Sequence, residues 1–200
     1  MFSDDDQEEV VRFVFSKEEN VELALAVMAA GQAIREKIIR EFLTKLEDEL
    51  WRRAKELGES WKVVNELSKD PFKRGLGLYL VKEDWRETYW VGLWSERGEA
   101  RDFVLGIWHE GVPQGFDGGR IREALEGRVR SGITNDQYPF YIWADPYRDW
   151  ADEATLSGLV GDRGSQAVRA LSDTTLTIAA ATEGIIDKLV RDWLKRPQKE

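Results

Sequence analysis

The chain has 200 residues, of which 42% are hydrophobic and 34% are charged, and its formal net charge is −9. This is the composition of a globular protein, and the length predicts a single domain over residues 1–200 with a core of its own. The absence of cysteine excludes disulfide bonds, thiol chemistry and cysteine-based zinc sites. The acidic balance disfavours strong binding of duplex nucleic acid, which depends on clustered Lys and Arg. It favours a protein partner with a basic surface.

The sequence also bears on localisation. No apolar run approaches the roughly 18 residues that a membrane helix needs. The first residues, "MFSDDDQEEVV", are acidic where a signal peptide is basic. We therefore expect a cytoplasmic protein that does not bind membranes.

The first elements are predicted to be an acidic start, a strand and a long helix. Residues 1–9 are polar and acidic, as in a disordered segment, and "VVRFVF" (10–15) is β-branched and aromatic, as in a strand. Ser16 and Glu19 have the spacing of a capping box. Apolar residues then recur at helical spacing as far as Leu57, just before Gly58, which predicts a helix over 16–57. The segment 59–73 is ambiguous.

The middle of the chain is predicted to form a sheet. Strands are expected at 75–81, 88–95 and 102–110, and their short polar connectors favour an antiparallel meander. A flexible loop (111–119), a short amphipathic helix (120–131), an aromatic connector (135–150) and a helix from about 165 to 195 follow. The predicted fold is α+β, with a three- to four-stranded antiparallel meander flanked by long N- and C-terminal helices.

Two of these strands contain a glycine two residues before a tryptophan, in "YWVGLW" and "FVLGIW". Because strand side chains alternate between faces, both glycines lie on one face, between aromatic side chains. A hairpin centred near Glu99 fixes the register between these strands. The expected pairs are Gly92–Gly106, Trp90–Trp108 and Trp94–Val104.

This trough of glycines has two interpretations. A helix can lie in it, because missing side chains let another backbone approach closely; the C-terminal helix, with small residues at 179–181, is the candidate. Alternatively, a ligand or a partner chain binds there, with tryptophans as anchors. We expect the helix. In the second case the binding residues are Tyr79, Trp90, Trp94 and Trp108.

Few residues offer catalytic chemistry. His109 is the only histidine and is expected to be structural or to lie on the surface. Nucleophile-elbow and phosphate-loop motifs are not found. Asp145, Asp149 and Asp152 form an alternative oxygen-ligated metal site, but helix capping is the preferred explanation. In that case Asp145 is an N-cap before Pro146, and Asp152 caps the next turn.

A basic cluster ends the last predicted helix. Its residues are Lys188, Arg191, Lys195, Arg196 and Lys199. Positive charge at a helix C-terminus complements the helix dipole, so we expect a solvated helix end in preference to a nucleic-acid contact.

Three segments carry a resemblance to a known family. "VKEDWRETYWVGLW", "FVLGIW" and "YPFYIWADPYRDW", followed by a long helix, resemble the region C-terminal to the catalytic core in bacterial and phage nucleases of the PD-(D/E)XK superfamily. The resemblance covers the order of elements over residues 20–195. The matching positions are Lys82, Trp85, Tyr89, Gly106, Tyr138, Pro139, Tyr141 and Trp150.

The catalytic signature of that superfamily is an Asp followed by Glu-x-Lys or Asp-x-Lys on the next strand, and no such strand is found here. "VKEDW" has its charges in the wrong order, and "REKII" lies in a predicted helix. The resemblance therefore implies the accessory region without its nuclease, and no catalytic residue is carried over.

We accordingly expect a non-catalytic protein-binding module that needs no cofactor. It would be an adaptor or an inhibitor, for instance of a nucleic-acid-processing or phage-defence enzyme. Two alternatives are a diverged Mg²⁺-dependent nuclease that uses Asp145, Asp149 or nearby carboxylates, and an accessory subunit of a nuclease complex.

Overall fold

A computed structural model describes residues 4–85, 88–110, 118–135 and 138–194. Within these residues, none of the helices is both long and apolar enough to cross a membrane. The elements in chain order are α1 (Asp4–Val14), α2 (Glu18–Ala54), β1 (Trp61–Asn65), β2 (Gly77–Lys82), the 3-10 helix η1 (Glu83–Trp85), β3 (Tyr89–Gly98), β4 (Arg101–His109), α3 (Gly118–Leu125), β5 (Phe140–Trp143), α4 (Glu153–Ser157) and α5 (Gly161–Leu194).

The strands form one antiparallel sheet in the order β1-β2-β3-β4-β5. This confirms the predicted meander and adds a strand at each edge. β1 comes from the segment that was ambiguous in the sequence. β5 is a strand of four residues inside the aromatic connector. Its alternating pattern is too short to be recognised in the sequence between the turn residues on either side.

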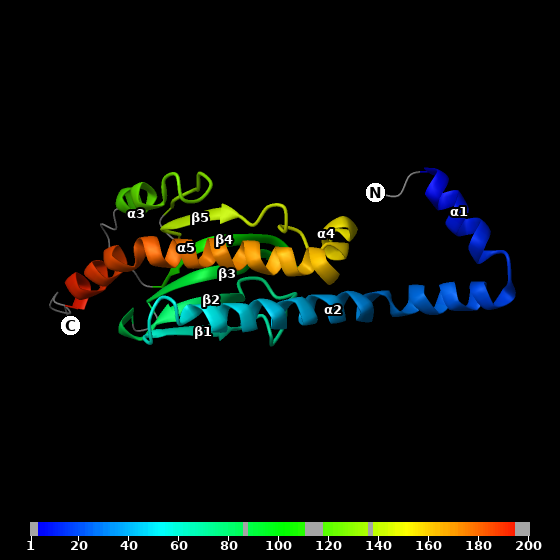
Figure 1. Ribbon diagram of the computed structural model, residues 1–200, viewed down its shortest axis with the longest axis horizontal. Helices are drawn as coiled ribbons and strands as arrows, with labels where there is room; N and C mark the ends of the chain where they lie inside the picture. The colour runs from blue at the N-terminus through cyan, green and yellow to red at the C-terminus, as the bar shows by residue number, and fades with distance from the viewer. Residues whose placement is uncertain (1–3, 86–87, 111–117, 136–137, 195–200) are drawn as a thin grey trace.

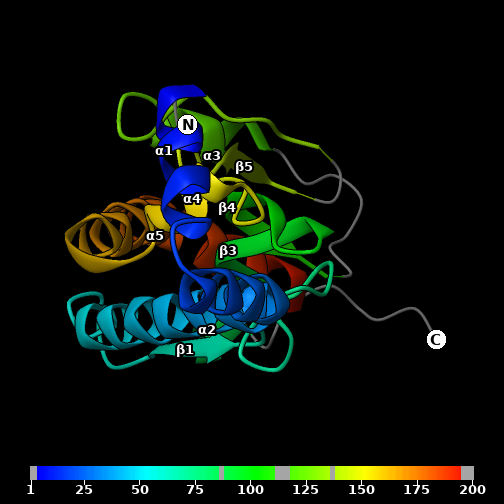
Figure 2. The same cartoon turned by 90° about the vertical axis from the view of Figure 1, so that its right-hand side faces the viewer.

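The two long helices, α2 and α5, lie side by side on the same face of the sheet (Figures 1 and 2). This face is mainly aliphatic, and it forms one cluster with both helices; we call it the aliphatic face. The buried strand residues in this cluster include Leu78, Leu80, Val91, Leu93, Leu105 and Ile107. Trp150, from the connector after β5, stacks on Phe103 of β4 at 3.9 Å and meets Phe42 of α2 edge-on at 5.3 Å. Trp150 therefore joins the sheet to α2.

The first residues differ from the sequence prediction. Residues 4–14 form helix α1 where a disordered start and a strand were expected. The carboxylates in its first turn suit the positive end of a helix dipole, so the acidic run favours a helix N-terminus. The capping box is also wrong: Lys17 is the N-cap of α2 and makes no side-chain cap bond, while Ser16 Oγ donates to Phe13 O at 2.6 Å.

Residues 4–34, which comprise α1 and the first part of α2, project beyond the sheet and the other helices (Figure 1). We call this segment the arm. α2 reaches the rest of the domain at Arg35, whose Nη2 donates to Ala151 O at 2.7 Å. From Ile39 onward, α2 contributes buried residues to the core. One continuous helix thus has an exposed half and a packed half.

Candidate functional site

The predicted register of the glycine-tryptophan strands is confirmed. The pairs are Gly92–Gly106, Trp90–Trp108 and Trp94–Val104. The neighbouring strands extend the glycine row, because Tyr79 of β2 lies opposite Gly92 and Tyr141 of β5 lies opposite Gly106. Two glycines are therefore flanked by a tyrosine on either side.

The expected helix does not lie in this trough. α5 packs on the opposite, aliphatic face, and Ala179, which was a candidate for the close contact, belongs to the main core there. No helix of the described residues covers the glycine face (Figure 2). The interpretation that a helix fills the trough is therefore wrong.

Aromatic rings from the neighbouring strands fill the trough instead. Tyr79 of β2 and Trp108 of β4 lie 6.2 Å apart with an interplanar angle of 28°, although β3 runs between them. The residue of β3 opposite Tyr79 is Gly92, which places no side chain between the two rings. Tyr79 also lies over Gly77, where an added Cβ would come within 2.1 Å of the tyrosine Cζ.

The glycines have a second role in the backbone. A Cβ on Gly92 would lie 2.2 Å from Leu78 O, and a Cβ on Gly106 would lie 2.2 Å from Phe140 O. Such distances are far below van der Waals contact, so only glycine allows the strands to approach as they do. The repeated glycine-tryptophan pattern therefore builds a close-packed sheet with a ring-covered surface.

We call this surface the aromatic face. It consists of Tyr79, Val81, Trp90, Trp94, Val104, Trp108, Tyr138, Tyr141 and Trp143. Tyr79 and Trp94 are 2% and 3% exposed. These two of the four predicted binding residues are therefore buried beneath the other rings and do not reach solvent. Trp90 and Trp108 are half-buried and stack on each other at 4.5 Å. They are the predicted residues that reach solvent.

Three aromatic residues of this face were not predicted: Tyr138, Tyr141 and Trp143. All come from the segment that was interpreted as a connector. The alternation in "FYIW" carried the signal, because Phe140 and Ile142 face the core while Tyr141 and Trp143 face the other way.

Charged groups lie at one margin of the aromatic face. Arg148 lies over the Trp143 ring at 3.6 Å from its centroid, and its Nη2 is 2.6 Å from Asp102 Oδ1. Trp94 Nε1 donates to Glu96 Oε1 at 2.5 Å. Burial, together with a hydrogen bond to Glu96, raises the pKa of Tyr138 to about 12. The margin therefore already contains a guanidinium stacked on a tryptophan.

The three aspartates of the connector have different local environments and do not form one site. Asp145 is exposed in a turn where no helix begins, so its predicted role as a cap is wrong. Asp149 Oδ1 accepts from Ala151 N at 2.9 Å. Asp152 is the N-cap of α4, as predicted, and accepts from Thr155 N at 2.8 Å. Among the described residues, no three His, Asp or Glu side chains are grouped so that they could hold a metal ion.

His109 is 9% exposed and lies beside Tyr89, with 5.9 Å between the ring centroids. Its position in the core agrees with a structural role. Lys188 and Arg191 of the basic cluster lie on α5, while Lys195, Arg196 and Lys199 lie outside the described residues.

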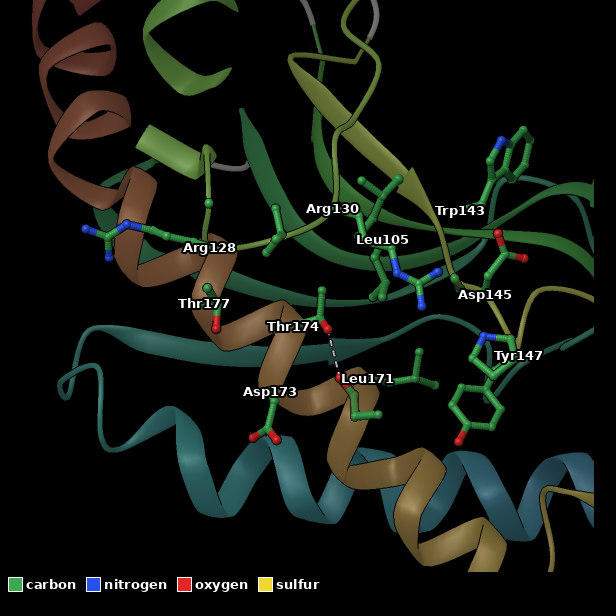
Figure 3. A pocket seen from close by; sticks show the side chains of 16 residues that line it. Leu105, Arg128, Arg130, Trp143, Asp145, Tyr147, Leu171, Asp173, Thr174 and Thr177 are labelled. Carbon is green, nitrogen blue, oxygen red and sulfur yellow. Dashed lines mark hydrogen bonds between the residues drawn. The ribbon is translucent and has the colours of Figure 1, made fainter. Parts of the chain in front are cut away.

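A groove of about 600 Å³ lies on the other side of the sheet, between α5, β5 and residues 127–130 (Figure 3). Its walls include Leu105 and Ile142 from the core and Thr174 and Thr177 from α5. Charges of both signs line it: Arg128, Arg130, Asp145 and Asp173. The groove therefore has no net preference for one sign of ligand charge.

Comparisons of this chain with family models, with curated proteins and with solved structures found no match. The resemblance to the nuclease accessory region remains a prediction.

Proposed function

We propose that this protein is a protein-binding module, an adaptor or an inhibitor, that binds a basic protein surface on its aromatic face. The observation that supports the proposal is the half-buried stack of Trp90 and Trp108, on a sheet face that no helix covers within the described part of the chain. Tryptophan and tyrosine are the residues that most often dominate binding energy at protein interfaces.

The ring contacts favour tight binding by a rigid surface. Trp90 and Trp108 stack on each other, Trp108 also contacts Tyr79, and Tyr79 is itself buried. Side chains that are held in place before a partner arrives lose little conformational entropy on binding. The aromatic face is therefore organised in advance for a partner.

Charge favours a basic partner. The chain has a net charge of −9, which attracts positive surfaces and speeds encounter with them. Lys and Arg side chains also bind tryptophan faces by cation–π contact. Arg148 on Trp143 shows that a guanidinium fits this surface. A nucleic-acid-processing enzyme has the kind of basic groove that this proposal requires.

The accessory-subunit alternative uses the same surface with a nuclease as partner. The Mg²⁺-dependent nuclease alternative needs connector carboxylates close together, whereas Asp145 lies in an exposed turn and Asp152 caps α4. The geometry therefore favours the binding module.

Site-specific photo-cross-linking tests the proposal. A photoreactive phenylalanine analogue is placed at Trp90 or Trp108, and at Trp51 as a matched control, since Trp51 is an exposed tryptophan on α2. We expect cells to yield a protein adduct from positions 90 and 108 but not from 51. We expect the adduct to contain a basic protein, and we expect less adduct to form when a cell lysate is irradiated at high salt.

A second variant tests whether the adduct depends on the tryptophan stack. Trp108→Ala should abolish the adduct formed from position 90 while the far-UV circular dichroism spectrum is retained. Adducts that form equally well from position 51, or that survive Trp108→Ala, would contradict the assignment of the aromatic face as the binding surface.

A further inference from the structure

Most of the exposed large apolar side chains of the described residues lie in the arm. Met28 is 77% exposed, Leu23 63% and Leu25 60%. Val10, Val11, Phe13 and Phe15 of the α1 segment are also more than half exposed. A soluble chain rarely leaves so many large apolar side chains uncovered in one region, and such patches mark interaction sites.

The apolar residues surround the helix. From Leu23 to Ile34 the sequence is "LALAVMAAGQAI", which has a single polar side chain, Gln32. A helix that is apolar on all sides is normally buried. These residues extend over about 18 Å of helix, too short for the roughly 30 Å hydrocarbon layer of a membrane. The arm thus has the character of a helix enclosed by other protein.

The charged residues at the two ends of this stretch indicate what kind of helix could cover it. Glu18, Glu19 and Glu22 come before it, and Arg35, Glu36 and Lys37 come after it. Glu36 is paired with Arg40 of its own helix, so Arg35 and Lys37 remain as the positive side chains next to the apolar stretch. A parallel copy of the same helix would bring like charges together. An antiparallel copy aligned at Met28 and Ala29 would bring Glu22 of each chain beside Arg35 of the other.

We propose that a second copy of this chain covers the arm. In this dimer the two α2 helices run antiparallel about a twofold axis near Met28, with their apolar stretches in contact and opposite charges at both ends. A twofold contact uses the same patch on both chains. The arm of one chain therefore contacts the arm of the other, and no other surface of the protein has to take part. The exposed apolar residues of α1 extend the contact from the tip of the arm. This inference is independent of the aromatic face, which lies on the sheet.

Mass measurement provides the first test. We expect light scattering on the full chain to give twice the 23.1 kDa of one chain. Leu25→Glu with Met28→Glu should give the single-chain mass and an unchanged far-UV spectrum, because both side chains are exposed in one chain. A single-chain mass for the unmodified protein at high micromolar concentration, or a dimer unaffected by the two glutamates, would overturn the proposal.

Cysteine cross-linking tests the direction of the helices, since the chain has no cysteine of its own. Met28→Cys or Ala29→Cys should form a disulfide between chains under mild oxidation. Leu23→Cys should not, because the antiparallel alignment separates the two copies of residue 23 by about 16 Å along the helix. Disulfide formation needs Cα atoms within about 7 Å. A cross-link at position 23 but at neither 28 nor 29 would overturn the antiparallel arrangement.

Charge exchange provides a further check on the pairing. Glu22→Arg alone should weaken the dimer at least several-fold, because it sets two arginines side by side. Combining it with Arg35→Glu should restore the dimer. In a parallel dimer Glu22→Arg would have no such effect. Arg35 also donates to Ala151 O within its own chain, so Arg35→Glu alone is the control for folding. If that variant keeps the far-UV spectrum of the parent and the double variant still fails to recover the dimer, the proposed pairing is wrong.

Discussion

Lys82 on β2 forms an ion pair with Asp187 on α5, with 2.8 Å between Nζ and Oδ2. The same ammonium lies 2.9 Å from Glu183 Oε1, and Trp85 Nε1 donates to Asp187 Oδ1 at 2.7 Å. Lys82 and Trp85 are the Lys-x-x-Trp positions of the family resemblance. In this fold both bind one carboxylate of α5, so the motif attaches the C-terminal helix to the end of the sheet.

Removing that carboxylate should destabilise the domain. The Lys82 side chain is only 10% exposed, so Asp187→Ala leaves a largely buried ammonium with one fewer partner. Hydrogen bonds to charged groups contribute about 1.5–3 kcal/mol each, and we expect a loss of that size in urea unfolding. Glu83→Ala is the matched control, because the Lys62–Glu83 pair is exposed and such pairs contribute about 0–1 kcal/mol. Equal effects of the two variants would contradict this explanation.

Valine at either trough glycine should lower stability. Gly92→Val and Gly106→Val each place a Cβ against the backbone of the next strand, and overpacking of this kind costs about 1–3 kcal/mol or more. Chemical denaturation measures the loss. Gly184→Ala is the control, since open space surrounds that helical position of α5, and it should gain about 0.5–1 kcal/mol. Valine variants as stable as the parent would show that the neighbouring strands can move apart at these positions without loss of stability.

Iodide quenching tests how exposed the aromatic face is. Trp108 is half-buried, whereas Trp85 is fully buried. Trp108→Phe should therefore reduce the fraction of tryptophan fluorescence that iodide can quench, and Trp85→Phe should not. A quenchable fraction unchanged by Trp108→Phe would mean that the stack is shielded in solution.

The two aspartates of the connector should differ in their effect on thermal stability. Asp152 caps α4, and the hydrogen bonds from Thr155 lower its pKa. Asp152→Ala should lower Tm by about 2–4 °C, whereas Asp145→Ala, in its exposed turn, should leave Tm unchanged. Because the pKa of Asp152 is lower in the folded state, its contribution is present near neutral pH and is lost as pH falls through that lowered value. Calorimetry at pH 7 and at pH 2–3 measures both effects.

Alkaline titration should reveal the buried phenols. Burial raises the pKa of Tyr89 to about 12 and that of Tyr138 to about 12, and it also raises the pKa of Tyr79. An unfolded tyrosine has a pKa of about 10. The stability contributed by these groups is therefore complete below pH 10 and is lost as pH rises through the folded values. Absorbance at about 295 nm should show phenols that ionise late and together with unfolding; complete ionisation by pH 10.5 would disprove their burial.

The sequence predicted the features that local periodicity controls. Alternation and the hairpin position gave the pairing of Gly92 with Gly106 and of Trp90 with Trp108, because register in a tight hairpin follows from the turn. Helical spacing gave α2 and α5. The short edge strands β1 and β5 were missed, since four or five residues have too few alternations to distinguish a strand from a loop.

The prediction failed where tertiary packing decides. When both faces of a sheet are apolar, the sequence does not indicate which face the helices cover. Here α2 and α5 both pack on the aliphatic face. The residues Tyr79, Trp90, Trp94 and Trp108 were correctly grouped on one face, but their exposure depends on rings contributed by other strands. Tyr138 and Trp143 come from a segment distant in sequence, so their part in the aromatic face could not be read from the hairpin alone.

The position of α5 has a consequence for synthesis of the chain. The aliphatic face of the sheet is complete once residue 143 has emerged from the ribosome, but one of its two covering helices spans residues 161–194. Until that helix is made, apolar strand residues face water, which favours aggregation of incomplete chains. A nascent chain stalled before residue 161 should therefore bind chaperones that recognise exposed apolar segments, and release should follow addition of α5.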